Sequence, residues 1–200
     1  MTAVPKKKLT VAEYLAIEKA AEFKSEFYDG EMFAMAGASR EHNRVSYNLT
    51  VELGVRLRGG PCEGFAADLR VKVDPTGLYT YPDLGIVCGP GEYDPLDRDT
   101  LINPTVLIEV LSPSTERYDR TVKFRHYKQI ESLREYVLVF QDEPAVERRV
   151  RQPDGRWVLG EVVGLAAEFV LDSVPLLVPI EDVYRGFAFP PSRPLREPIT

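Results

Sequence analysis

Two acidic residues stand inside otherwise apolar stretches of the sequence, and their side chains are the best candidates for chemistry. Asp83 lies in residues 81–88 (YPDLGIVC), and Glu109 lies in residues 105–111 (TVLIEVL). Short aliphatic and β-branched runs bounded by Pro or Gly predict buried strands. An ionised carboxylate in such a strand is costly unless a cation or a hydrogen-bond donor meets it. We therefore expect one cation to hold both acids.

A divalent metal is the simplest cation for this role. Proteins bind Mg²⁺ through one or two carboxylates, leave several waters on the ion and take further ligands from substrate phosphates. Asp83 on one strand and Glu109 on the next fit Mg²⁺, or Mn²⁺ in its place. The competing interpretation is that either acid caps a loop or pairs with an arginine.

Further motifs accompany the two acids. Pro82 precedes Asp83, residues 109–115 read EVLSPST, and a D-R-x-x-K-x-x-x-Y pattern follows at Asp119, Arg120, Lys123 and Tyr127. Together these motifs resemble the Uma2 family of the PD-(D/E)xK nuclease-like superfamily. Weaker similarity, at residues 26–31 (EFYDGE), His42 and residues 135–136, extends the resemblance over roughly residues 9–185.

One position departs from the superfamily pattern, which has a lysine two residues after the second acid. Position 111 is Leu. The resemblance implies that Lys123, on the following helix, takes over the role of that lysine. The alternative is an ordinary helical ion pair between Asp119 and Lys123, which are four residues apart.

The resemblance implies a fold and a site. The fold is a restriction-endonuclease-like α/β core with the order α-β-β-β-α-β and a mixed sheet, an N-terminal helix and hairpin, and a C-terminal β-hairpin extension. The implied protein is a metal-dependent, homodimeric endonuclease that cleaves nucleic acid, with DNA the expected substrate. Its metal ligands would be Asp83, Glu109 and the Val110 carbonyl, with Lys123 acting on the water or the phosphate, and Glu26, Glu41 or His42 beside the site.

The rival function is a nuclease-fold binding or assembly module that has lost turnover. An acidic net charge, the missing lysine at position 111 and an acidic stretch at residues 89–103 favour the module. The retained Asp, Glu and Lys set favours the enzyme. A small-molecule hydrolase is disfavoured because the sequence has no nucleophile motif such as GxSxG.

Composition limits the class of protein. The 200 residues, 44% of them hydrophobic, suffice for one globular domain, which we expect over residues 9–188. A formal charge of −6 means that nucleic-acid binding must depend on metals and a local basic patch. Cys62 and Cys88 form no CxxC motif and only two histidines are present, so zinc is not expected. With no membrane span and no secretory signal evident, we expect a cytoplasmic protein with free thiols.

The N-terminal elements follow from capping and turn signals. Residues 1–8 are expected to be a disordered lead-in. Thr10 with Glu13 predicts a capping box for a helix that reaches about residue 20. Asp29-Gly30 predicts a type I′ hairpin whose first strand carries Glu26. Ser39 should cap a helix over residues 40–58, with His42 in its first turn.

The rest of the chain alternates strands and helices. Residues 65–73 predict one strand, with Arg70 and Lys72 on a solvated face or in contact with phosphate, forming a hairpin with the Asp83 strand. A polar loop is expected at residues 89–103, a helix at 118–130 and a buried strand at 133–140. The remaining predictions are hairpins at residues 145–163 and 169–178, a short helix at 180–184 and a Pro-rich tail at 189–200.

Overall fold

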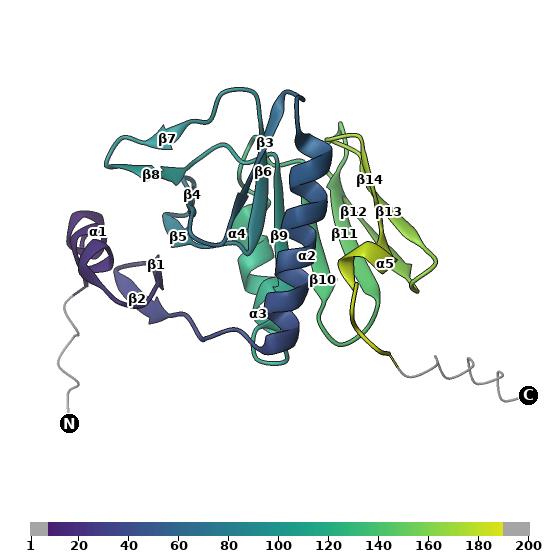
Figure 1. The fold of residues 1–200 in the computed structure, drawn as a ribbon. Helices are drawn as coiled ribbons and strands as arrows, with labels where there is room; N and C mark the ends of the chain where they lie inside the picture. Colours follow the sequence, from purple (N-terminus) through teal and green to yellow (C-terminus); the bar gives the residue numbers. More distant parts are fainter. Residues whose placement is uncertain (1–7, 190–200) are drawn as a thin grey trace, which may run out of the picture.

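The computed structural model describes residues 8–189 and contains two six-stranded sheets (Figure 1). The predicted lead-in and tail lie outside the described residues, apart from Lys8 and Phe189. One sheet has the strand order β2-β1-β5-β4-β8-β7. Its strands are β1 (Ser25–Tyr28), β2 (Glu31–Ala34), β4 (Arg70–Val73), β5 (Leu78–Thr80), β7 (Tyr93–Asp94) and β8 (Asp97–Leu101).

The other sheet has the order β12-β11-β10-β9-β6-β3 and forms the centre of the molecule. It consists of β3 (Cys62–Ala66), β6 (Leu84–Cys88), β9 (Val106–Leu111), β10 (Glu135–Phe140), β11 (Ala145–Arg151) and β12 (Trp157–Val163). β9 and β10 are parallel, whereas β6 runs antiparallel to β9. The sheet is therefore mixed, and the predicted restriction-endonuclease-like α/β class is confirmed.

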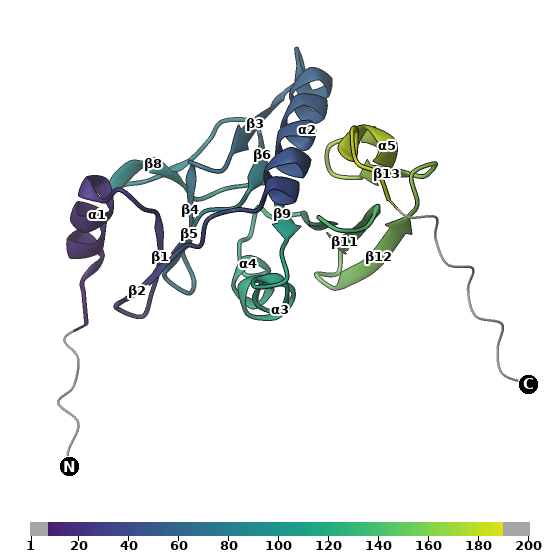
Figure 2. The same cartoon turned by 60° about the horizontal axis from the view of Figure 1, so that its bottom comes forward.

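Helices cover both faces of this central sheet (Figure 2). One face carries α2 (Arg40–Leu57), whose Val45, Leu49, Leu53 and Leu57 recur every fourth residue and are all buried. The opposite face carries a continuous helical run of α3 (Glu116–Tyr118), the π-helical turn η1 (Asp119–Lys123) and α4 (Phe124–Tyr127). Side chains alternate along β9, so Glu109 shares the α4 side with Leu107 and Leu111.

The N-terminal elements agree with the sequence signals. α1 (Val11–Ala20) begins with the capping box of Thr10 and Glu13, and its Tyr14 ring stacks on Phe27 at 4.6 Å between centroids. Asp29 and Gly30 both have positive φ, as a type I′ turn requires. At the other end, β13 (Glu168–Leu171), β14 (Leu176–Pro179) and α5 (Ile180–Val183) close the fold beside α2. Within residues 8–189, no helix combines the length and the apolar character needed to cross a membrane.

The structure differs from the predictions in one strand, its hairpin pairing, one loop and the bounds of one helix. Residues 65–73 are two strands, because a turn at 67–69 sends β3 to the central sheet and β4 to the other one. β6 pairs with β3, not with β4, and Asp83 lies in the bend just before β6. The predicted loop at 89–103 contains the β7–β8 hairpin. The predicted helix at 118–130 begins earlier, at Glu116, and ends at Tyr127.

The predicted free thiols are also wrong, because Cys62 and Cys88 form a disulfide. The two residues stand directly opposite each other in the antiparallel pairing of β3 with β6. Directly opposed residues on neighbouring strands bring their Cβ atoms close enough for such a bond. Sequence spacing alone did not reveal this register.

Candidate active site

Lys123 is the centre of a buried group of charged side chains. It lies in η1, only 4% of it is exposed, and its Nζ is 2.8 Å from Glu109 Oε1. Glu26 Oε1 and Asp119 Oδ1 lie 3.6 and 3.7 Å from the same nitrogen. The predicted lysine therefore reaches the predicted acid from the following helix.

Glu109 is held between two donors on the helical run. Its Oε1 accepts a hydrogen bond from the Tyr127 hydroxyl at 2.9 Å in addition to the Lys123 contact. Tyr127 lies one turn after Lys123, so both side chains face β9. Glu109 itself is 4% exposed, which makes the helical run, and not solvent, its immediate environment.

Asp83, in the bend just before the neighbouring strand β6, lies beside the end of β9. The Val110 N–H donates to its Oδ2 at 2.7 Å, and His42 Nε2 lies 3.1 Å from the same oxygen. The β6–β9 ladder starts at the Leu84–Ile108 pair, so Asp83 accepts the N–H that the ladder leaves free. In an extended strand the N–H and C=O of one residue point to the same side, so the Val110 carbonyl points to the side of β9 on which Asp83 lies.

His42 and Glu26 reach the site from two other elements. Ser39 caps α2 by accepting the His42 N–H at 3.0 Å, which fixes the first turn that carries the imidazole. Glu26, on β1, accepts hydrogen bonds from the Thr80 hydroxyl and, at 2.7 Å, from the Tyr118 hydroxyl. Both predicted residues are therefore at the site, whereas Glu41 is exposed on α2 with no recorded partner among the described residues.

Sequence reasoning missed several members. Asp119 was a residue of the family motif and a possible helical partner of Lys123, but not a predicted site residue, yet it is buried beside Glu109. Its four-residue spacing to Lys123 was the available signal. Thr80 and Tyr118 gave no signal, because a hydroxyl in a strand or a helix is common. We call Glu26, Asp83, Glu109, Asp119 and Lys123 the acid–lysine cluster.

Negative charge is in excess in this cluster, with four carboxyl groups for one ammonium group. Burial raises the pKa of Glu109 well above its usual range; Lys123 opposes this shift, whereas Asp119 and Asp83 reinforce it. Burial likewise raises the pKa of Asp119. Burial would lower the pKa of Lys123, but Glu109, Glu26 and Asp119 outweigh it and raise that pKa. The lysine is held as a cation among acids that it only partly neutralises.

The donor set fits a small, hard divalent cation. Within residues 8–189, Asp83 Oδ1 and Glu109 Oε2 accept no recorded hydrogen bond, so each acid keeps one oxygen for a ligand. The same residues include no group of three or more His, Cys, Asp or Glu side chains placed to hold an ion. Two carboxylates, a main-chain carbonyl, waters and substrate oxygens are the ligands typical of Mg²⁺.

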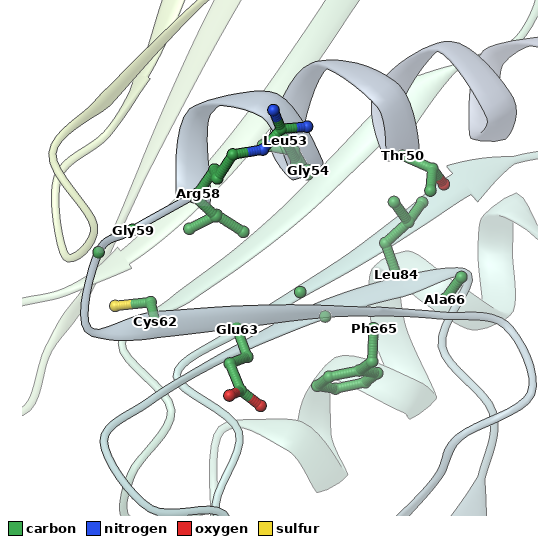
Figure 3. Close-up of a pocket in the computed structure, with 14 residues that line it drawn as sticks. Thr50, Leu53, Gly54, Arg58, Gly59, Cys62, Glu63, Phe65, Ala66 and Leu84 are labelled. Carbon is green, nitrogen blue, oxygen red and sulfur yellow. The ribbon is translucent and has the colours of Figure 1, made fainter.

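A hollow lies away from the cluster, between the C-terminal half of α2 and β3 (Figure 3). Its volume is about 620 Å³, and its lining includes Leu53, Arg58, the disulfide residue Cys62 and Phe65. None of the acid–lysine cluster lines it. The cluster is nearly closed, and Asp83, whose side chain is 20% exposed, is its most accessible carboxylate.

Comparison with known proteins gives the family. The Uma2 model, described as "Putative restriction endonuclease", matches residues 11–180. This chain belongs to the Uma2 family. Two Synechocystis sp. (strain ATCC 27184 / PCC 6803 / Kazusa) relatives agree over nearly their whole length. The protein slr1290 is 35% identical over 188 residues (92% of this chain, 96% of the relative), and sll1609 is 36% identical over 168 residues (84% and 95%); both are described as uncharacterized.

A solved structure supports the fold of this Uma2 chain. It comes from Anabaena variabilis ATCC 29413 and is described as "a putative nuclease belonging to DUF820". The two structures align with a TM-score of 0.71 and 19% sequence identity, covering 88% of this chain and 97% of the other. At that identity the likeness establishes the shared fold.

Proposed function

We propose that this Uma2 protein is a metal-dependent endonuclease that hydrolyses phosphodiester bonds of nucleic acid, with DNA as its substrate. The observation that carries the proposal is the convergence of Asp83, Glu109 and Lys123 from three separate elements, with negative charge in excess. The family description and the nuclease-like fold support the same reaction class.

Asp83, Glu109 and the Val110 carbonyl would hold Mg²⁺ or Mn²⁺. When bound, such an ion makes a hydroxide available near neutral pH and neutralises charge that develops on the phosphate. Each of the two acids is already oriented by protein donors, Asp83 by the Val110 N–H and Glu109 by Tyr127. The donors reduce the freedom of the carboxylates before any ligand arrives.

Lys123 supplies positive charge at the reacting phosphate or orients the attacking water. Its ammonium group is fixed by three carboxylates, so little reorganisation is needed during reaction. Glu26, which accepts hydrogen bonds from Thr80 and Tyr118, lies 3.6 Å from the Lys123 ammonium group. His42 orients Asp83 through their 3.1 Å contact.

The test is cleavage of labelled plasmid and linear DNA with Mg²⁺ or Mn²⁺ by the wild type, Asp83→Asn and Glu109→Gln. We expect each variant to lose about 100-fold or more in rate. Glu135→Gln is the matched control, because Glu135 is a buried acid on the adjacent strand β10 that binds Ser173 instead of Lys123. Undiminished cleavage by either site variant, or an equal loss in the control, would contradict the assignment.

Titration calorimetry with Mg²⁺ separates this function from the binding or assembly module. A nuclease should bind the ion in the wild type and lose binding in Glu109→Gln. Absence of binding in the wild type would favour the module. The homodimer and the cytoplasmic location stay predictions from the sequence.

A further inference from the structure

We propose that Tyr28 and Phe33 form an aromatic platform on which bases of an unpaired nucleic-acid strand stack beside the acid–lysine cluster. The inference rests on the proposed function and adds to it a class of substrate, a strand whose bases are not paired at the site. It also addresses a physical difficulty of that function, which is that a protein of formal charge −6 with an acidic site must hold a polyanion.

The two aromatic residues lie on the β1–β2 hairpin, next to Glu26. Phe33 on β2 is paired directly with Glu26 on β1, and Tyr28 follows Glu26 by two residues. Directly paired residues of an antiparallel ladder share a face of the sheet, as do residues two apart on one strand. Tyr28 and Phe33 are diagonal neighbours in this ladder, so their rings are within reach of each other. One face of the hairpin therefore carries both rings and a member of the cluster.

The contacts of the hairpin identify this face as the one that meets the helical run. Glu26 accepts a hydrogen bond from the Tyr118 hydroxyl of α3, and the Tyr28 ring stands edge-on to His126 of α4. The intervening Phe27 points the other way and packs against α1. The aromatic platform is therefore on the side of the hairpin where the cluster lies, and not on the side that α1 covers.

Both rings of the platform remain open to solvent. Phe33 is 48% exposed and Tyr28 is 40% exposed, whereas Phe27 on the opposite face is 3% exposed. Neither ring of the platform belongs to a hydrophobic cluster of the described residues. β2 is the edge strand of its sheet, so no further strand among residues 8–189 covers Phe33 (Figure 1). Exposed aromatic rings beside a buried charged site suit a flat, apolar ligand surface such as that of a nucleobase.

Stacking supplies affinity for nucleic acid without a basic surface. An aromatic side chain can bind any base, because every base has a π-face. A base inside a duplex already stacks on its neighbours, so the platform fits an unpaired or flipped nucleotide and not an intact double helix. With a base on Phe33, the adjoining phosphates of the strand would lie toward Glu26 and Lys123, whose charged groups are 3.6 Å apart.

The test compares aromatic and aliphatic side chains at these positions. Phe33→Leu and Tyr28→Leu keep an apolar side chain but lose the π-face, whereas Phe33→Trp keeps an aromatic ring. Tyr93→Leu is the matched control, because Tyr93 is 47% exposed on β7, the opposite edge strand of the same sheet. Binding of a fluorescein-labelled DNA oligonucleotide, as a single strand and as a duplex, is followed by anisotropy over a range of salt concentrations. The buffer contains Ca²⁺, in which gels show no cleavage, and thermal unfolding checks that each variant is folded.

We expect Phe33→Leu and Tyr28→Leu each to bind the single strand at least about fivefold more weakly than the wild type. The slope of log affinity against log salt should stay unchanged, because neither variant removes a charge. Phe33→Trp and Tyr93→Leu should remain within about twofold of the wild type. The wild type should bind the duplex more weakly than the single strand, and the leucine variants should not change duplex binding.

Several results would overturn the platform. They are unchanged single-strand binding by Phe33→Leu or Tyr28→Leu, equal weakening by Tyr93→Leu, and no single-strand binding by the wild type. Equal weakening by Phe33→Leu and Phe33→Trp would mean that Phe33 only fills space, and equal losses on the duplex would reject an unpaired substrate. Cleavage by the wild type with unchanged binding in the leucine variants would reject the platform alone. Platform-dependent binding without cleavage in Mg²⁺ or Mn²⁺ would reject only the proposed function.

Discussion

Two buried charged regions of this protein look alike in composition and differ in what their surroundings do to the acids. In the acid–lysine cluster, burial and neighbouring acids raise the pKa of Glu109. In the network around Arg70, on the α1 side of the other sheet, burial would raise the pKa of Asp97, but Thr100 and Arg70 outweigh it and lower that pKa. The fold thus supports the ionised form of one acid and opposes that of the other.

The hydrogen bonds of Arg70 help to explain why the pKa of Asp97 is lowered. Its guanidinium donates to Asp97, to the Thr100 hydroxyl at 2.9 Å and to the Tyr81 hydroxyl at 2.7 Å. Tyr81 in turn donates to Glu18 at 2.9 Å. Two carboxyl groups accompany one guanidinium there, whereas four carboxyl groups accompany one ammonium group in the cluster. Acids whose pKa values are raised because they are buried around one shared cation are candidates for a ligand site, whereas an acid whose pKa is lowered by its own hydroxyl and guanidinium partners has a structural role.

Removing the cation from each region should have the largest effect on stability. Lys123→Met and Arg70→Met each leave buried carboxylates without their partner, at a cost of about 3 to 5 kcal/mol in the free energy of unfolding. The contrast lies in the response to metal. Mg²⁺ should restore part of the stability of Lys123→Met and none of Arg70→Met, as measured by urea unfolding with and without the ion. The same Mg²⁺ response in both variants would remove the distinction between the regions.

Neutralising one acid in each region should change stability less than removing the cation, and the Arg70 network should lose more stability than the acid–lysine cluster. Asp97→Asn leaves Arg70 without a charged partner and should cost about 1 to 3 kcal/mol. Glu109→Gln should cost less or stabilise the protein, because Lys123 keeps Glu26 and Asp119. An ionisable residue that destabilises the fold relative to its neutral variant is expected at a position where function requires that residue.

The stability of each of these two variants relative to the wild type should change with pH, in a direction set by the pKa shift of the acid that is replaced. The Glu109 pKa is raised in the folded state. Its contribution to the free energy of unfolding is therefore present below the ordinary pKa of 4.5 and is lost as pH rises through the folded-state pKa. The advantage of Glu109→Gln should therefore grow with pH. The Asp97 pKa is lowered, so its contribution is present above 3.8 and is lost as pH falls. The penalty of Asp97→Asn should shrink in acid; parallel pH profiles for the two variants would contradict the comparison.

The sequence predicted the residues of the acid–lysine cluster better than the environment of Arg70. Asp83 and Glu109 stood out because an acid in an apolar run needs a partner, and Lys123 because of its motif. For Arg70 and Lys72, strand alternation correctly put both side chains on one face. The prediction that this face is solvated or contacts phosphate was wrong. α1 and the β7–β8 hairpin cover the face, and the hairpin supplies Asp97 and Asp94 as partners of Arg70 and Lys72. Alternation identifies a face but not the element that packs on it.

Long-range register was the other limit of the sequence. Turn and cap signals are local, so α1, the Asp29-Gly30 hairpin and α2 were predicted close to their true bounds. The pairing of β3 with β6 joins residues 18 to 26 positions apart, and only that pairing opposes Cys62 to Cys88. The π-helical turn that positions Lys123 could not be predicted either, because the sequence pattern was interpreted with the period of an α-helix.

The smallest expected effect is a shift in the pKa of His126, which tests whether the acids of the cluster act on a neighbouring side chain. His126 is buried on α4 with its ring edge-on to Tyr28, 4.7 Å between centroids. Burial lowers its pKa, Glu26 opposes that shift, and Arg125 adds to it. We expect an NMR titration to give His126 a pKa below its ordinary value of 6.5, with the protein losing stability as pH falls below that value, because the unfolded state then binds a proton that the folded state does not.

Two variants make this titration specific to the cluster. Glu26→Gln removes the charge that supports the protonated ring, so the His126 pKa should fall further. Glu31→Gln, an exposed acid on the partner strand of the same hairpin, should leave it unchanged. His42→Gln assigns the two histidine signals. A His126 pKa above 6.5, or equal shifts in the two glutamate variants, would mean that the excess charge reaches beyond the five residues of the cluster, and the contrast with the Arg70 region would then describe a broad field instead of a site.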